Sequence, residues 1–302
     1  MALFGRRKPQ VPADIEVEVA ALARRVFAER GVEATIEGEA GSRTLLADGS
    51  QYPVYNLVAK CVGEPRKAWG EIVARHMGSM VSARDNPKVS AMDVGAVRAQ
   101  VRTRILPADL GDLPIDLSYA RPLAPGLVLA LCMDYPDTVS TLGASDVEQL
   151  GLPVDELYRY GQANTDGEPI DVHDHVADGV FVIDGGSLFI ASKTADMQHL
   201  IETVIGPAPH GVVFTVPHRQ LVFYTVPTST AVLGAINTLM TITVNVLRDP
   251  TSPPPGGPIS TGLYYWADGM IEGIGGFDPV EQSIEVEATG RFGDMLNTLP
   301  GP

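Results

Sequence analysis

The chain has 302 residues, of which 45% are hydrophobic, and a formal net charge of −15 at pH 7. This length suggests one large domain or two small ones, and the hydrophobic content excludes an intrinsically disordered chain. The acidic balance disfavours nucleic acid as a partner, because neutralising phosphates requires clustered Lys and Arg. It disfavours an anionic membrane surface for the same reason.

The cysteine content and the N-terminal segment indicate the cellular compartment of the protein. Cys61 and Cys132 lie far apart, each in a strand-like run, so the sequence predicts neither a disulfide framework nor a zinc site made by cysteine alone. We expect two buried, reduced thiols. The segment MALFGRRKPQ has basic residues but no apolar run after them, so it is not a secretory signal. We therefore expect a cytoplasmic protein.

The first 85 residues predict a helix, three strands and a second helix. Asp14 can cap the first helix, whose apolar residues recur on one face. Asp48-Gly49 is a strong two-residue turn signal between the second and third strands. The expected elements are a loose tail over residues 1–12, a helix from Asp14 to about Arg30, strands at 34–37, 44–47 and 52–61, and a helix after Pro65.

A candidate domain boundary follows. The stretch Asp109–Pro125 is rich in Pro, Gly and Asp. Residues 97–106 before it alternate like a strand, and the continuous apolar run 127–133 after it is typical of a strand buried on both faces. The expected segments are a tail over 1–12, an N-terminal unit over 13–110, a C-terminal unit over 115–275 and a tail over 276–302.

The C-terminal unit predicts hairpins separated by helices. In chain order we expect helices at 145–150 and 153–164, a hairpin of GVFVI and SLFIAS, an amphipathic helix from Met197 to Gly206, a hairpin of VVFTV and LVFYTV, and a final hairpin turned at Asp268-Gly269. The fold class is therefore α+β, with antiparallel sheets packed against helices. Helix–strands–helix occurs at 14–83 and again at 196–247, which indicates either a divergent internal repeat or an order common in this class.

The longest uncharged stretch of the chain runs from Gln220 to Leu247. Its second part, 229–247, has the length of a membrane span, but it contains two asparagines and several hydroxyls, and no Lys or Arg cluster flanks it. We expect a buried strand followed by a buried helix that Thr228 or Ser229 caps. The high β-branched content leaves a strand in the second half as an alternative.

The densest group of potential metal ligands is Asp171–Asp178, DVHDHVAD. In an extended segment His173 and His175 point the same way, and Asp178 can complete a site for a transition metal. The segment has no second, distant motif, and His and Asp are ordinary residues of a solvated loop. A metal site is therefore the alternative interpretation here, and a metal-dependent hydrolase is the alternative function.

Two further places are candidates for partner binding. His218 and Arg219 stand in the Pro-His-Arg-Gln segment that joins two apolar strands, where they can bind an anion or an acidic group, although turns also prefer polar residues. Trp266 belongs to an aromatic hairpin of which one face packs in the core and the other can face a partner.

Signatures of catalysis are absent from the sequence. It contains no G-x-S-x-G, no P-loop and no G-x-G-x-x-G after a strand, and no carboxylate pair stands in an apolar setting. We therefore expect no catalytic residues and no cofactor. The function expected is that of a non-enzymatic binding or adaptor protein, with a protein as the partner and with neither nucleic acid nor a membrane span.

A family resemblance covers about residues 120–274. The order VVFTVPHRQLVFYTV, LGAINTLM and PISTGLYYWADGMIEGI resembles the bacterial domain-of-unknown-function family 1444, whose members carry a V-P-H strand end, an apolar strand, a small-residue helix and a closing aromatic hairpin. The loop 250–258 and the residues after Gly276 depart from that pattern. The resemblance implies a cytoplasmic bacterial protein, and it supplies no catalytic residues because the family has no assigned activity.

Overall fold

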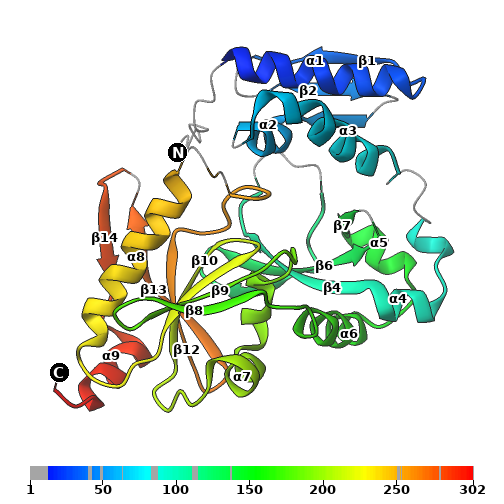
Figure 1. Cartoon of the computed structure of the whole chain (residues 1–302). Coiled ribbons are helices and arrows are strands. Elements are labelled where there is room, and N and C mark those ends of the chain that lie inside the picture. The colour runs from blue at the N-terminus through cyan, green and yellow to red at the C-terminus, as the bar shows by residue number, and fades with distance from the viewer. Residues whose placement is uncertain are drawn as a thin grey trace. The chain divides into compact units, whose positions relative to one another are not determined.

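The chain has an α+β fold, in which helices cover antiparallel sheets (Figure 1). The computed structural model describes residues 13–39, 43–47, 50–62, 64–82, 88–110, 115–136, 138–249, 252, 254–278 and 280–301. These divide into two compact units, of which the first spans Met1–Asn86 with Arg248–Gly257 and the second spans Pro87–Leu247 with Pro258–Pro302. The expected tail over 1–12 and the turn at Asp48-Gly49 lie outside the described residues.

The first unit packs helices on a three-stranded sheet with the order β1-β2-β3. Its elements are α1 (Ala13–Glu29), β1 (Ala34–Glu37), β2 (Thr44–Ala47), β3 (Ser50–Pro53), α2 (Tyr55–Val62) and α3 (Arg66–Ser82). Side chains that recur every four residues along α1 and α3 meet in one core with Leu45 of β2. Phe27 of α1 and Trp69 of α3 are the largest of them.

The expected strand at 52–61 is wrong beyond Pro53. Proline has no amide hydrogen with which to continue a ladder, and the carbonyl of Val54 accepts from the amides of Leu57 and Val58, which starts α2. The buried Leu57, Val58 and Cys61 follow the helical spacing i, i+1, i+4. A short apolar run does not distinguish a strand from a buried helix by periodicity alone.

The second unit begins with a four-stranded sheet beside three helices (Figure 1). β6 pairs with β4 on one side and with β5 and β7 on the other. The elements are η2 (Val89–Ala91), α4 (Val94–Gln100), β4 (Val101–Pro107), β5 (Arg121–Ala124), β6 (Leu127–Asp134), β7 (Val139–Thr141), α5 (Ala144–Gln149) and α6 (Val154–Asp166). The ladder of β4 and β6 joins the two sides of the stretch 109–125, so the division between the units lies near residue 87 instead.

The expected strand at 97–106 is helical up to Gln100. Asp93 accepts a hydrogen bond from the amide of Ala96 at 3.0 Å, which caps the N-terminus of α4. The strand starts only at Val101. Both cysteines are buried and free, as expected, and burial raises the pKa of Cys61 to about 11 and that of Cys132 to about 12.

A seven-stranded antiparallel sheet with the order β14-β13-β12-β10-β11-β9-β8 forms the rest of the second unit. Its strands are β8 (Val172–Ala177), β9 (Val180–Asp184), β10 (Val212–His218), β11 (Leu221–Thr225), β12 (Gly262–Ala267), β13 (Met270–Asp278) and β14 (Ser283–Val286). One face packs on α8 (Val232–Arg248) and α9 (Gly290–Thr298). The other packs on η3 (Ala191–Asp196), α7 (Met197–Leu200) and the π-helical turn η4 (Ile201–Ile205).

The expected hairpin of GVFVI and SLFIAS is wrong. β9 turns at Asp178-Gly179 to pair with β8, so the His/Asp segment expected as a loop is an edge strand. Gly179 has a φ of +69°, which suits this turn. Ser187 instead accepts a hydrogen bond from the amide of Phe189, and the chain coils into η3.

The uncharged stretch forms β11 and α8, which confirms a buried strand followed by a helix. The helix continues through its β-branched residues to Arg248, so the strand alternative is wrong. Its burial is one-sided, because Leu239 is fully buried whereas Leu233 is 49% exposed. No helix of the part of the chain that the structure describes is long and apolar enough to cross a membrane.

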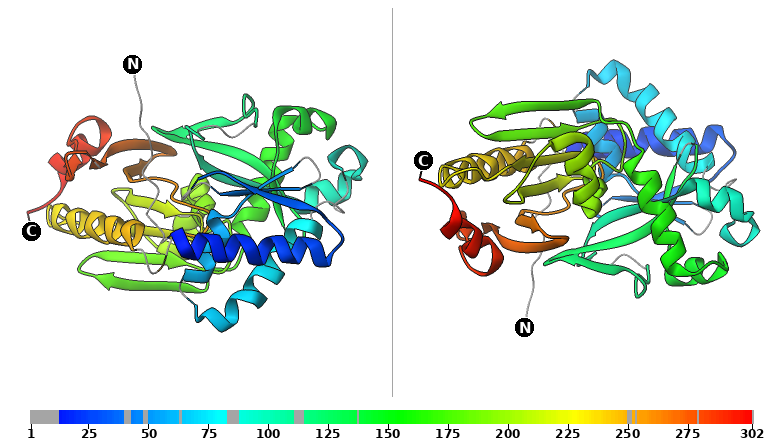
Figure 2. Two further views of the ribbon diagram at one scale, coloured as in Figure 1. Left: turned by 90° about the horizontal axis from the view of Figure 1, so that it is seen from above. Right: turned by 90° about the horizontal axis from the view of Figure 1, so that it is seen from below.

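The residues after Gly276 belong to the second unit. β14 pairs with the end of β13, and Phe292 of α9 is fully buried in the core that α8 covers. Leu296 packs against the same core. The amide of Thr230 donates to the carbonyl of Pro300 at 3.0 Å, which ties the chain end to the segment before α8 (Figure 2).

The two leucines of α8 provide a matched test of this packing. We expect Leu239→Ala to lower the free energy of unfolding by about 2–5 kcal/mol, because it leaves a cavity in the core. Leu233→Ala should change it by about 0.5 kcal/mol or less, because that side chain faces solvent. Urea unfolding followed by circular dichroism measures both. Equal effects of the two substitutions would contradict the observed orientation of α8.

Candidate functional site

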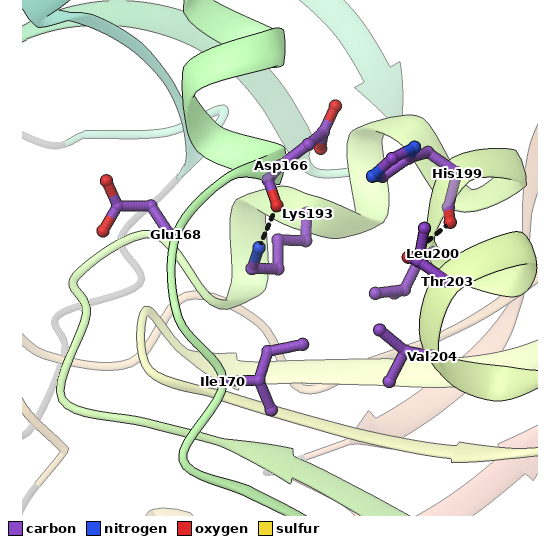
Figure 3. Close-up of a pocket in the computed structure, with 8 residues that line it drawn as sticks. All are labelled: Asp166, Glu168, Ile170, Lys193, His199, Leu200, Thr203 and Val204. Atoms are coloured by element: carbon purple, nitrogen blue, oxygen red, sulfur yellow. Dashed lines mark hydrogen bonds between the residues drawn. The ribbon is translucent and has the colours of Figure 1, made fainter.

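A cavity of about 260 Å³ lies between the C-terminal end of α6 and the turns η3, α7 and η4 (Figure 3). Ile170, Leu200 and Val204 form its apolar wall. The polar wall carries Lys193 and His199, with Thr203 and the acidic residues Asp166 and Glu168 around them. The cavity therefore combines cationic or neutral donors with an apolar surface.

Local hydrogen bonds fix the turns that carry these side chains. Thr194 donates to the carbonyl of Ala191 at 2.7 Å within η3. Asp196 then caps α7 by accepting from the amide of His199 at 3.1 Å. Thr203 donates to the carbonyl of His199 at 2.7 Å, and the chain leaves the π-helical turn at Gly206, whose φ is +87°. Single π-helical turns are frequent at functional sites.

Lys193 is the most unusual residue of the cavity, since only 3% of it is exposed. Its ammonium donates to the main-chain carbonyl of Asp166 at 2.6 Å (Figure 3). Within the described ranges no carboxylate lies within 4.0 Å of this nitrogen. Burial lowers the pKa of Lys193, while the charges of Asp166 and Glu168 act in the opposite direction. An ammonium has three N–H donors, so two remain for a ligand.

The two carboxylates of the cavity are engaged elsewhere. Glu168 accepts from Arg102 at 3.0 Å and from Ser187 at 2.8 Å, one bond to each oxygen. Asp166 accepts from Gln162 at 2.8 Å, and burial raises the pKa of its carboxyl group. Figure 3 shows this carboxyl group turned away from the Lys193 side chain. Neither carboxylate therefore takes up the two remaining N–H groups of Lys193.

Trp266 lines a second hollow, of about 600 Å³, between the loop 207–211, the end of β12 and α9. Met295 is part of the same lining, and Tyr265 donates to the carbonyl of His210 at 3.0 Å. Gly211 has a φ of +77°, and a Cβ atom there would lie 2.2 Å from the carbonyl oxygen of Trp266. The close approach of the loop to β12 therefore requires glycine.

His218 and Arg219 lie at the other end of β10 from Trp266. Trp266 pairs with Val212 at the start of that strand, so His218 stands six residues away, roughly 20 Å along the strand. His218 is only 8% exposed, and its Nδ1 accepts from the amide of Gln220 at 3.3 Å. The three partner-binding candidates thus do not form one surface, and His218 is a buried strand residue rather than part of an exposed tip.

His173 and His175 extend from the same face of β8, as the sequence predicts. His173 Nε2 lies 2.7 Å from the hydroxyl oxygen of Tyr224, and the ring of His175 lies 5.1 Å from that of Phe181. Asp178 follows a bulge in the pairing between His175 and Ala177. Among the described residues, no group of three or more His, Cys, Asp or Glu side chains is placed to hold a metal ion.

Reasoning from the sequence missed Lys193. The signal was available, because the chain has only five lysines and this one follows the apolar run SLFIAS. Its burial depends on the long-range contacts of η3, which no local pattern reveals.

Comparisons with protein families, with curated proteins and with solved structures found no match to this chain. The resemblance to family 1444 over residues 120–274, with the bacterial and cytoplasmic origin that it implies, therefore stays a prediction from the motifs. The geometry of the chain is the basis of the functional argument below.

The burial of His218 predicts a pH dependence of stability. Burial and then the charge of Arg219 lower the pKa of His218 to about 4, so the folded protein keeps this ring neutral between pH 4 and 6.5 while the unfolded chain binds a proton. The stability is therefore complete above pH 6.5 and is lost as the pH falls. From this pKa difference we expect a loss of about 3 kcal/mol between pH 7 and pH 4.

The variant His218→Asn keeps a hydrogen-bond acceptor but removes the titration. We expect its free energy of unfolding to fall less steeply than that of the wild-type protein over this range. Chemical unfolding at several pH values measures the difference. Parallel curves for the two proteins would show that His218 is accessible to protons in the folded state.

Proposed function

We propose that the chain is a non-enzymatic binding protein that holds a small anionic molecule in the Lys193 cavity. One observation carries this proposal. The Lys193 ammonium is buried in the cavity wall, bonded to one main-chain carbonyl, and has no carboxylate within 4.0 Å among the described residues. Burying an ammonium without a directly bonded carboxylate is costly, and an anionic ligand in contact with it would offset part of that cost beyond what the more distant charges of Asp166 and Glu168 provide.

The dimensions of the cavity limit the ligand. A volume of about 260 Å³ lies just below the usual range for pockets that hold drug-sized molecules, which indicates a ligand of few heavy atoms. An acidic group would accept charge-assisted hydrogen bonds from Lys193, with the His199 ring as a neighbour. The apolar wall of Ile170, Leu200 and Val204 favours a short hydrocarbon portion. Small carboxylic acids meet both requirements.

The arrangement supports binding better than catalysis. Both carboxylates of the cavity are bonded to other residues, because Glu168 accepts at both oxygens and Asp166 accepts from Gln162 at one. The alternative of a metal-dependent hydrolase would need His173, His175 and Asp178 to converge. The expected protein partner stays a proposal as well, for which the hollow beside Trp266, with its aromatic lining, is a candidate surface.

A series of straight-chain monocarboxylates of two to six carbons tests the cavity. We expect at least one member to bind and to raise the melting temperature, since a ligand at 100 times its Kd adds about 2.7 kcal/mol to stability. Lys193→Met should weaken binding roughly tenfold or more, because a hydrogen bond to a charged group is lost. Calorimetric titration measures the affinities.

Lys67→Met is the matched control, because Lys67 is an exposed residue of α3. It should bind with the wild-type affinity. Binding that survives Lys193→Met, or the absence of binding throughout the series, would refute the proposed site. A stoichiometric metal that His173→Ala removes from the purified protein would favour the hydrolase instead.

A further inference from the structure

Two arginines from distant parts of the chain are held next to each other in the second unit. Arg104 lies on β4, and Arg219 begins the two-residue turn between β10 and β11. The amide of Ile105 donates to the Ser192 hydroxyl at 3.0 Å, and the amide of Ala191 donates to the carbonyl of Arg219 at 3.1 Å. Because Ala191 and Ser192 are consecutive, these bonds tie the turn that begins with Arg219 and the strand that carries Arg104 to the same two residues of η3.

Neither guanidinium has an acidic partner among the described residues. The Nε of Arg219 is buried and without a hydrogen-bond partner. Arg104 donates to the neutral hydroxyl of Thr141 at 3.2 Å. Two carboxylates near β4 pair with another arginine of this strand. Arg102 pairs with Glu168 at 3.0 Å and with Asp134 at 3.6 Å. This is unexpected in a chain with 37 acidic and 22 basic residues.

The two charges affect each other. Burial and then the like charge of Arg104 lower the pKa of Arg219 to about 10, and burial lowers the pKa of Arg104. A guanidinium stays protonated at neutral pH in proteins, so both groups carry a positive charge. Two neighbouring, partly desolvated cations without a counter-ion destabilise the fold, and an anion between them would reverse that effect.

We propose that Arg104 and Arg219 together bind a phosphate-type oxyanion, either inorganic phosphate or the phosphate group of a small molecule. Guanidinium groups present planar pairs of N–H donors that match the oxygens of phosphate. The Thr141 hydroxyl accepts from Arg104, so its own hydrogen is free to donate to the same anion. The site is separate from the Lys193 cavity and does not depend on the function proposed for it.

Inorganic phosphate is the first probe. At constant ionic strength, with chloride replaced by phosphate, we expect the melting temperature of the wild-type protein to rise. Arg104→Gln and Arg219→Gln should weaken phosphate binding roughly tenfold or more in calorimetric titration, because each removes charged hydrogen bonds. Arg159→Gln is the matched control, since Arg159 is an exposed arginine of α6, and it should bind phosphate as the wild-type protein does.

The sign of the stability change gives a second readout. Without phosphate, Arg219→Gln should be at least as stable as the wild-type protein, because it removes a cation that lacks a counter-ion. With phosphate the order should reverse. A variant that fails to fold in chloride, a phosphate effect equal in all four proteins, or no effect beyond chloride would overturn the proposal.

Two further ligands distinguish the sources of the anion. Glycerol phosphate that binds as tightly as inorganic phosphate, or more tightly, would identify a small phosphorylated molecule as the ligand. Weaker binding would identify the free ion. Acetate that binds as tightly as inorganic phosphate and glycerol phosphate would overturn the assignment to a phosphate-type anion.

Discussion

The arrangement of the second unit depends on two hydrogen bonds made by consecutive residues of η3. Ala191 donates to the carbonyl of Arg219, and Ser192 accepts from the amide of Ile105. The first bond reaches the turn of the seven-stranded sheet and the second reaches β4 of the four-stranded sheet, so one short turn joins both. Lys193 is the next residue, and its burial follows directly. Buried main-chain amides must find acceptors, which makes these bonds costly to lose.

The charged side chains around η3 differ in whether they have a carboxylate partner. A net charge of −15 says only that acidic residues are in excess, so basic side chains have many potential carboxylate partners. Arg102 pairs with Glu168 and Asp134. Lys193 and Arg219 make no ion pair with a carboxylate among the described residues, although both are largely desolvated. Unpaired buried cations are unfavourable for folding alone, which is the physical basis of the two anion-binding proposals.

The sequence predicted the parts of the fold that local chemistry decides. The turn at Asp268-Gly269 has positive φ at both residues, and the helix from Met197 ends at Gly206, as glycine at those positions indicates. The errors fall on short apolar runs at 52–61, 97–106 and 187–192, where helix and strand bury similar residues and distant contacts decide. The candidate site was missed for the same reason, since the carbonyl that accepts from Lys193 lies 27 positions away and the amide bonded to its neighbour Ser192 lies 87 positions away. The divergent repeat stays a prediction, because β1-β2-β3 forms a sheet of its own whereas β10 and β11 lie inside a larger one.

The His/Asp segment illustrates how a pattern of ligand residues can have a structural cause. β8 is the edge of the seven-stranded sheet, and five of its six residues are exposed. An exposed edge offers unpaired amides and carbonyls to other chains, and proteins commonly counter this with charged residues and irregular pairing. Asp171, Asp174 and Asp178 place carboxylates along this edge, and the pairing has a bulge after His175. The histidines turn towards Tyr224 and Phe181 and cover aromatic surface. The polar residues that resemble a metal site in the sequence thus suit a strand that must not pair further.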